Sequence, residues 1–267
     1  MERTVWATEQ VPLRRYQRQM VLPALGLAAQ KRLAAGRVLV VGVGGIGTWA
    51  AELLARAGVG FLRLVDDDRV ELTNIHRQAL YGESEAAGLL SKPAAAARRL
   101  GEINGQTVVE PIETRLDRHN IAGLAGDVDV ILDGTDNWPS RFLINDFAVK
   151  HGKAWVLAGA VGTEAQTMVI IPGRTPCLRC VLDCPPETCT ADCCRTAGVL
   201  GPAVAAIAAF QAAEAIKILA GRPEAVNPNL LKFDVWRNTV QQMCLQRPAG
   251  ASACVCCGEK EYEFLEP

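Results

Sequence analysis

The sequence has few histidines and almost no excess of charge. Only three histidines, His76, His119 and His151, occur in 267 residues, and the formal net charge is −1. A balanced charge disfavours nucleic acid and membrane surfaces as obligatory partners, because both attract an excess of Lys and Arg. A charged ligand must therefore meet a local cluster of charges. We expect surface or structural roles for the three histidines.

The sequence also lacks a secretion signal and a long hydrophobic run. The N-terminus MERTVWATEQ carries charges without an apolar stretch, and the longest apolar run, GVLGPAVAAIAAF, is too short to span a bilayer. We therefore expect a cytoplasmic protein. Internal repeats and low-complexity linkers are missing too, and 49% of the residues are hydrophobic. One domain with a large core, covering residues 1–267, is the expected organisation.

Cysteine, by contrast, is abundant, with ten residues. Disulfides are rare in the cytosol, so metal ligation or thiol chemistry is the better explanation. The pairs Cys177-x-x-Cys180 and Cys254-x-x-Cys257 have a spacing that lets two thiolates approach one tetrahedral zinc ion. Four sulfur ligands leave no open coordination position, so the pattern predicts a structural zinc site. Cys256, as a spectator or a substitute ligand, leaves the register of the second pair open.

A second group of cysteines lies in the segment CPPETCTADCC, which contains Cys184, Cys189, Cys193 and Cys194. A regulatory disulfide, an additional metal site and buried inert thiols are all compatible with this spacing. The remaining Cys244 lies in a strand-like run, which predicts a position in the core.

Strand and helix patterns alternate in the first part of the chain. Apolar runs bounded by turn residues predict strands at residues 38–42, 61–65, 107–110, 128–132 and 154–158. Helical patterns lie between them at residues 47–58, 91–104 and 138–152. This alternation predicts an α/β fold with a mainly parallel sheet.

The pattern changes after about residue 160. Strand-like runs at 165–173, 230–236 and 239–246 are joined by irregular connections and by one long helix, predicted from Pro202 to Leu219. We expect these strands to extend the same sheet in antiparallel fashion. The predicted fold is therefore a Rossmann-like, mainly parallel sheet with an antiparallel extension and a zinc-bound C-terminal segment.

Residues 37–70, RVLVVGVGGIGTWAAELLARAGVGFLRLVDDDRV, contain a strand-to-helix turn rich in glycine. Gly42, Gly44 and Gly47 form G-x-G-x-x-G, which lets the backbone turn tightly, approach a phosphate and pack the helix on the sheet. Close packing alone would also favour glycines. Asp66 ends the next strand, where a carboxylate accepts hydrogen bonds from ribose hydroxyls. The pattern predicts a nucleotide site, and both NAD and ATP satisfy it.

The charges that follow favour ATP. Arg77 and Lys92 lie downstream of the second predicted strand, and Asp136 and Asn137 follow the fourth in DGTDN. Loops at the carboxyl ends of parallel strands meet over one crevice, so these groups should converge on one ligand. Two cations neutralise phosphate oxygens, and a carboxylate is a suitable ligand for Mg²⁺. This combination suits a magnesium-bound triphosphate better than a dinucleotide.

The motifs resemble those of the ThiF/MoeB/HesA family, the bacterial relatives of ubiquitin-activating enzymes, and they occur in the same order. The resemblance covers roughly residues 12–258 and rests on RYQRQM, GVGGIG, DDDRVELTNIHRQ, Lys92, LDGTDN, CLRC, CCRTAGV and QAAEAIKILAG. It implies an adenylyltransferase that uses ATP and Mg²⁺ on the C-terminal glycine of a ubiquitin-like sulfur carrier ending in Gly-Gly, which is later converted to a thiocarboxylate. Residues 12–160 would form the nucleotide-binding half, and residues 161–267 the carrier- and zinc-binding half.

The resemblance also implies roles for single residues. Asp66 would bind the ribose, and Asp136 the magnesium ion. Arg18 corresponds to an arginine that reaches into the neighbouring subunit's site in homodimers. Cys194 matches the cysteine that ThiF-like members use in sulfur transfer, whereas MoeB-like members have no firm need for it. The expected catalytic residues are Arg18, Arg77, Lys92, Asp136 and Cys194. The expected nucleotide-binding residues are Gly42, Gly44, Gly45, Gly47, Asp66, Asp68, Asn74, Arg77, Gln78, Lys92, Asp136 and Asn137.

Other interpretations stay open at this point. Relatives activate a threonylcarbamoyl group in tRNA, although they tend to lack the paired zinc cysteines and need a basic face. A NAD(H)-binding oxidoreductase is the alternative from another class. RTAGV and DDDRV resemble ThiF and thiamine synthesis most, but a carrier for molybdopterin or another product fits as well. Because no sulfurtransferase domain follows residue 267, a separate sulfurtransferase or cysteine desulfurase is expected as sulfur donor.

Overall fold

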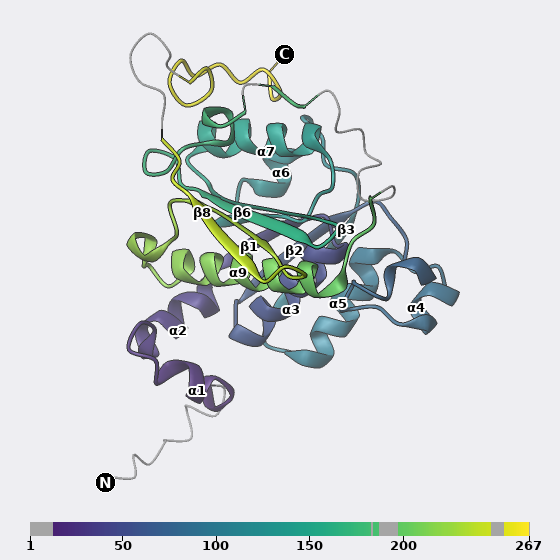
Figure 1. Cartoon of the computed structure of the whole chain (residues 1–267). Coiled ribbons are helices and arrows are strands. Elements are labelled where there is room, and N and C mark those ends of the chain that lie inside the picture. Colours follow the sequence, from purple (N-terminus) through teal and green to yellow (C-terminus); the bar gives the residue numbers. More distant parts are fainter. Residues whose placement is uncertain (1–12, 183, 187–196, 247–253, 267) are drawn as a thin grey trace, which may run out of the picture.

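One eight-stranded sheet organises the protein (Figure 1). The computed structural model describes residues 13–182, 184–186, 197–246 and 254–266. The strand order is β3-β2-β1-β4-β5-β6-β7-β8. The strands are β1 (Arg37–Val41), β2 (Phe61–Asp66), β3 (Val108–Glu113), β4 (Val130–Asp133), β5 (Ala154–Val161), β6 (Glu164–Ile170), β7 (Leu230–Asp234) and β8 (Thr239–Met243). The α-helices are α1 (Gln17–Met20), α2 (Gly26–Ala35), α3 (Gly45–Ala57), α4 (Glu83–Ala87), α5 (Lys92–Ile103), α6 (Ile121–Ala125), α7 (Trp138–His151) and α9 (Gly201–Leu219). Short 3-10 helices are η2 (Leu72–Asn74), η3 (Leu178–Cys180) and η4 (Pro223–Ala225).

The first five strands form the parallel half of the sheet. β1 pairs in parallel with β2 and β4, and β2 pairs with β3. β1 and β4 consist almost entirely of Val, Leu and Ile, and their side chains are buried. Such continuous apolar strands are typical of parallel sheets, because helices cover both faces. All five strands predicted in this half are present, with ends shifted by up to three residues.

The last three strands extend the sheet in antiparallel fashion, as the sequence predicts. β6 returns directly beside β5 after a turn at Gly162, which has a φ of +61°. β7 and β8 continue the same sheet. The mainly parallel α/β fold with an antiparallel extension is therefore confirmed.

Helices cover the two faces of the sheet (Figure 1). α3, α5 and α9 pack on one face, and α6 and α7 lie on the other, with the C-terminal segment above α7. Of the helices that the structure describes, only α9 is long and apolar enough to cross a membrane by length and composition. The expectation that no run has that length was therefore wrong. α9 packs on α3 and on strands β4 to β6, and this burial accounts for its apolar composition.

Some predictions about single elements were wrong. β3 continues through Pro111 to Glu113, because an edge strand tolerates a residue without an N–H. Cys244 follows the last residue of β8 and is exposed, so it is not a core residue. β8 is the other edge strand, and all five of its residues are exposed. The short helices α1, α2, α4 and α6 had no counterpart among the predicted elements.

Candidate functional site

A cavity of about 920 Å³ opens at the carboxyl ends of the parallel strands. Its wall includes most of the residues expected to bind a nucleotide, which come from five segments of the chain. The expected residues that line it are Gly42, Gly44, Gly45, Asp66, Asp68, Asn74, Arg77, Gln78, Lys92, Asp136 and Asn137. The structure thus brings together groups that are up to 95 positions apart in the sequence (Asn137 and Gly42).

The glycine turn forms the floor of this cavity. Gly42 has a φ of +82°, and a Cβ there would lie 2.6 Å from the carbonyl oxygen of Gly134. A Cβ on Gly45 would lie 2.9 Å from the side chain of Val204. At Gly44, which precedes α3, the nearest heavy atom would be 3.7 Å away, so the absent side chain leaves free space. The turn therefore gives a ligand direct access to the backbone at the N-terminus of a 13-residue helix, where N–H groups attract phosphate.

Asp66 and Lys92 lie on one wall of the cavity. The Asp66 carboxylate accepts hydrogen bonds from the backbone N–H of Val43 (2.7 Å) and of Asp68 (2.8 Å). Burial raises the pKa of Asp66, and the positive charge of Lys92 opposes that shift. Lys92 is buried, and its Nζ lies 2.6 Å from a carboxylate oxygen of Asp68. A buried ammonium needs such a counterion, and phosphate oxygens are equally suited to that place.

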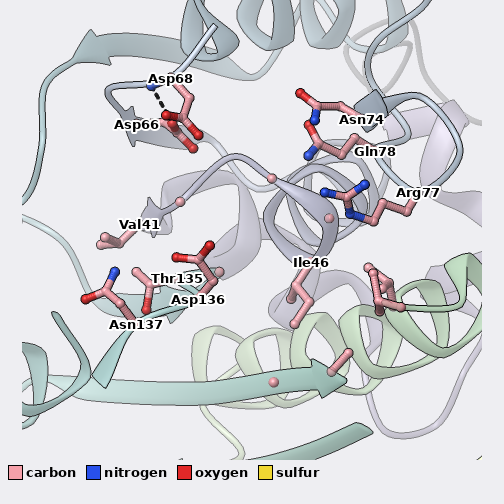
Figure 2. Close-up of a pocket in the computed structure, with 18 of the residues that line it drawn as sticks. Val41, Ile46, Asp66, Asp68, Asn74, Arg77, Gln78, Thr135, Asp136 and Asn137 are labelled. Carbon is pink, nitrogen blue, oxygen red and sulfur yellow. Dashed lines mark hydrogen bonds between the residues drawn. The ribbon is translucent and has the colours of Figure 1, made fainter. Parts of the chain in front are cut away.

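Arg77 and two amides lie on the other side of the glycine turn. Figure 2 shows Asp66 and Asp68 to one side of the turn, and Asn74, Gln78 and Arg77 to the other. The Asn74 side-chain oxygen accepts the N–H of Glu71 at 3.1 Å, which fixes this segment. Gln78 is buried, and its Oε1 has no hydrogen-bond partner among the described residues. A buried polar atom without a partner in a cavity wall is consistent with a polar ligand.

A buried ion pair supports the loop that carries Asp136. Asp133 is fully buried, and its carboxylate accepts hydrogen bonds from the N–H (2.8 Å) and hydroxyl (2.6 Å) of Thr135. Arg141 Nε lies 3.1 Å from that carboxylate, and Nη2 donates to the carbonyls of Thr135 and Ala158. Burial raises the pKa of Asp133, against the charge of Arg141.

This framework leaves Asp136 itself exposed in the cavity wall. The next residue, Asn137, also lines the cavity, but its side-chain oxygen accepts the N–H of Ser140 at 3.0 Å and caps α7. The cap uses one of the two lone pairs of this oxygen, so Asn137 can still offer a ligand the second lone pair and its amide nitrogen.

The cavity continues over the ends of the antiparallel strands. Its floor there consists of Gly159, Ala160 and Val161 at the end of β5. Beyond them, Glu164 of β6 and Lys232 of β7 form an ion pair of 2.9 Å. The site thus contains the glycine turn in one part and the end of β5 in the other.

The two cysteine pairs come together at a separate place, on the face of the sheet covered by α7. Sulfur atoms of Cys177, Cys180, Cys254 and Cys257 all lie within 4.8 Å of one another. The distances are 3.8 Å for Cys177 to Cys180, 3.5 Å for Cys177 to Cys254 and 3.4 Å for Cys180 to Cys257. A tetrahedral zinc ion with Zn–S bonds of about 2.3 Å holds its sulfurs about 3.8 Å apart. The four residues fit such an ion.

Helix α7 anchors this cysteine cluster. Asn145 accepts the N–H of Leu178 (2.8 Å) and donates to the sulfur of Cys256 (3.3 Å). Asp146 accepts the N–H of Phe264 at 2.9 Å. Cys256 is fully buried and its sulfur is not part of the group of four, so the geometry favours Cys254 and Cys257 as the second pair.

Comparison with known proteins gives the family. The ThiF family profile matches residues 16–256. The chain belongs to the ThiF family. Among curated relatives of this ThiF-family chain, the sulfur carrier protein ThiS adenylyltransferase of Bacillus subtilis (strain 168) is 39% identical over 94% of the chain and 73% of that protein.

Longer relatives resemble the ThiF-family chain over part of their length. The adenylyltransferase and sulfurtransferase uba4 of Aspergillus fumigatus is 40% identical over 94% of this chain and 53% of that protein. The adenylyltransferase and sulfurtransferase MOCS3 of Sus scrofa is 40% identical over 95% of this chain and 55% of that protein. The chain thus spans about half the length of these two proteins. The structure of E. coli MccB with ATP has a TM-score of 0.74 at 23% identity, covering 86% of this chain and 70% of that one. That likeness shows the fold alone.

Not every predicted residue of this ThiF-family chain lines the cavity. Gly47 is outside the described wall, and a Cβ there would lie 1.9 Å from the carbonyl oxygen of Gly42. Gly47 therefore serves the close packing of α3 on the glycine turn. Cys189, Cys193 and Cys194 lie outside the described residues, whereas Cys184 is exposed.

Arg18 lies away from the cavity of its own chain. It belongs to α1, and the preceding Tyr16 bonds to Asn104 and Gln106 and packs on Gly58. These partners precede β2 and β3, so α1 lies at the amino ends of the strands, whereas the cavity lies at their carboxyl ends. Arg18 is exposed, and it is not among the described residues that line the cavity.

Sequence reasoning missed three residues that hold the site in shape. The Tyr81 hydroxyl lies 2.8 Å from the carbonyl of Val43 and 3.1 Å from that of Lys92, so it ties the glycine turn to the start of α5. Asp133 and Arg141 are the other two. The sequence offered no distinct signal for Arg141, because its helix contains other polar and charged residues as well.

Proposed function

We propose that the chain adenylates the C-terminal glycine carboxylate of a small ubiquitin-like sulfur-carrier protein, using ATP and Mg²⁺. The observation that carries this proposal is the convergence of the glycine turn, Asp66, Arg77, Lys92 and Asp136 on one cavity. The ThiS, uba4 and MOCS3 relatives, which are named adenylyltransferases, agree with it. The adenylated carrier would then be converted to a thiocarboxylate for the synthesis of thiamine, molybdopterin or a related compound. We place the enzyme in the cytosol.

The residues suit this reaction because the nucleophile is already charged. A carboxylate needs no general base at neutral pH, but its attack on the α-phosphate must overcome repulsion between anions. Arg77 and Lys92 neutralise phosphate charge, and Asp66 retains lone pairs for the ribose hydroxyls after accepting two backbone N–H groups. Asp136 would hold Mg²⁺, which supplies positive charge against the departing pyrophosphate.

The part of the cavity over β5 suits the tail of the carrier. Gly159 and Ala160 line this part with small residues, so we propose that an extended Gly-Gly segment lies along them toward the glycine turn. We assign residues 12–160 to nucleotide binding and residues 161–267 to binding of the carrier and zinc. Arg18 would complete the site of a second subunit, because it cannot reach the cavity of its own chain.

Two further assignments complete the proposal. The cysteine cluster holds a structural zinc ion, which joins η3 to the C-terminal segment. Cys194 takes part in sulfur transfer from a separate sulfurtransferase or cysteine desulfurase. Its replacement by serine is expected to leave adenylation intact and to abolish a covalent link to the carrier, which intact-mass spectrometry detects. Normal thiocarboxylate formation by that variant would contradict the role.

Exchange of radiolabel between pyrophosphate and ATP tests the proposed function. Exchange should require Mg²⁺ and a carrier protein ending in Gly-Gly, and a panel of such carriers identifies the preferred one. A carrier with an amidated C-terminus is the matched control, because it lacks the attacking carboxylate. Absence of exchange with every carrier, together with binding of NAD in preference to ATP, would favour an oxidoreductase instead.

A further inference from the structure

His76 lies in the wall of the cavity and contacts Arg77, although we expected only a surface or structural role for it. Its Nε2 is 2.9 Å from Nη1 of Arg77. The same Nη1 donates to the carbonyl oxygen of Thr73 at 2.9 Å. These two contacts hold one end of the guanidinium. Nη2 and Nε of Arg77 are left for phosphate oxygens.

The direction of the contact between His76 and Arg77 follows from the chemistry of the two groups. A guanidinium has five N–H donors and no acceptor, and it stays protonated in proteins. Nε2 of His76 must therefore accept, which requires a neutral imidazole with its proton on Nδ1. A protonated imidazole would set N–H against N–H and place two positive charges 2.9 Å apart. One of the two side chains would then have to move.

We propose that neutral His76 is a positioning residue that directs Arg77 toward the nucleotide phosphates, and that protonation of His76 weakens nucleotide binding. Histidine is the side chain that ordinarily changes charge between pH 5 and 8, and this is therefore the pH range in which the proposal is tested. This inference rests on the proposed function, because it takes the phosphates of ATP as the ligand of Arg77.

The surroundings of His76 contain few other charges. α9 begins beside it, and a Cβ on Gly201 would lie 2.7 Å from the His76 carbonyl oxygen. The ionisable residues of α9, Glu214 and Lys217, lie near the opposite end of that helix. α3 contributes Trp49, whose indole N–H donates to the carbonyl of Arg77 at 3.2 Å.

The remaining charged groups of this region are engaged elsewhere. Glu71, on the same segment as His76, accepts the hydroxyl of Thr73 at 3.1 Å. Asp66 and Asp68 lie beyond the glycine turn (Figure 2). Asp68 is paired with Lys92. In the part of the chain that the structure describes, Arg77 is therefore the charged group in hydrogen-bond contact with the imidazole.

Binding of a non-hydrolysable ATP analogue, measured calorimetrically at fixed Mg²⁺ between pH 8 and 5.5, tests the proposal. His76→Gln keeps an acceptor at this position but does not titrate, whereas His76→Ala removes the acceptor at every pH. Between pH 8 and 5.5 the affinity of the wild type should fall about tenfold more than that of His76→Gln. The nucleotide phosphates also titrate in this range, and the comparison of variants cancels that contribution. The affinity of His76→Ala for the analogue should fall no more on acidification than that of His76→Gln.

His119→Gln provides the matched control. Arg118 Nε donates to Nε2 of His119 at 3.2 Å, so the local pairing is similar, but His119 is not part of the described cavity wall. The affinity of this variant for the analogue should fall on acidification as much as that of the wild type. The inference fails if acidification lowers the affinity of His76→Gln for the ATP analogue as much as that of the wild type. It also fails if the wild type binds the analogue more tightly at pH 5.5 than at pH 8.

Pyrophosphate exchange, run on the same variants, separates this inference from the proposed function. Exchange that depends on a carrier but has the same pH profile in the wild type and His76→Gln overturns the role of His76 and leaves the function intact. A difference in analogue binding without exchange by any carrier supports His76 and overturns the function.

Discussion

At the scale of single residues, the groups expected to contact the ligand were predictable and those that support them were not. Asp66, Arg77 and Lys92 stand in short motifs whose spacing places them after strands, so the topology of a parallel sheet brings them together. Tyr81 and Arg141 act through partners that only the fold supplies. A buried hydroxyl or ion pair leaves no periodic signal in a sequence, because its partners are distant along the chain.

Lys92 provides a test at this scale. Because its ammonium is buried beside the glycine turn and would neutralise phosphate charge, Lys92→Ala should lower carrier-dependent pyrophosphate exchange by about 10²–10³-fold. Thermal unfolding of the variant checks that it is folded, and Arg56→Ala, at the far end of α3, is the control for loss of a surface charge. Unchanged exchange in folded Lys92→Ala would remove this residue from the mechanism.

At the scale of elements, α7 connects the two candidate sites. Its N-terminus is capped by Asn137 in the cavity wall, and its middle holds the cysteine cluster through Asn145 and Asp146. The sequence predicted this helix almost to the residue, since Pro139 marks its first turn and Gly152 its end. It did not reveal that Cys256 packs on α7, because the contact between Cys256 and Asn145 joins residues that are 111 positions apart.

The cysteine cluster therefore makes a sharp prediction. Anaerobically purified protein should contain one zinc ion per chain, and Cys257→Ser should lose it, because three thiolates hold zinc less tightly than four. Cys256→Ser is the matched control and should retain the metal. Elemental analysis with thermal unfolding, before and after a chelator, provides the measurement. Zinc lost from Cys256→Ser but kept by Cys257→Ser would show that the register is wrong.

At the scale of the whole molecule, the cavity and α1 lie at opposite ends of the parallel strands. The cavity lies at the carboxyl ends of the strands, whereas α1 with Arg18 lies at the amino ends. The sequence did not predict that Arg18 lies away from the cavity, because α1 was not among the predicted elements. We propose that Arg18, which lies outside the cavity of its own chain, acts on the cavity of another copy.

Mixing of variants tests that shared site. Arg18→Ala and Asp136→Ala should each be inactive as homodimers, because each lacks one essential group in both sites. After subunit exchange, a mixed dimer would contain one intact site, so activity should return to about a quarter of that of the wild type when random pairing makes half of the dimers mixed. Native mass spectrometry confirms that exchange has occurred. Mixed dimers without activity would contradict the shared site.

The central claim is that the chain transfers AMP to the C-terminal carboxylate of a carrier protein, and intact-mass spectrometry of the carrier tests it most directly. After incubation with the enzyme, ATP and Mg²⁺, with pyrophosphatase to remove the second product, the carrier should gain the mass of one AMP group. The gain should disappear with Asp136→Ala and with a carrier whose C-terminus is amidated. An unmodified carrier, or AMP on the amidated one, would contradict the account.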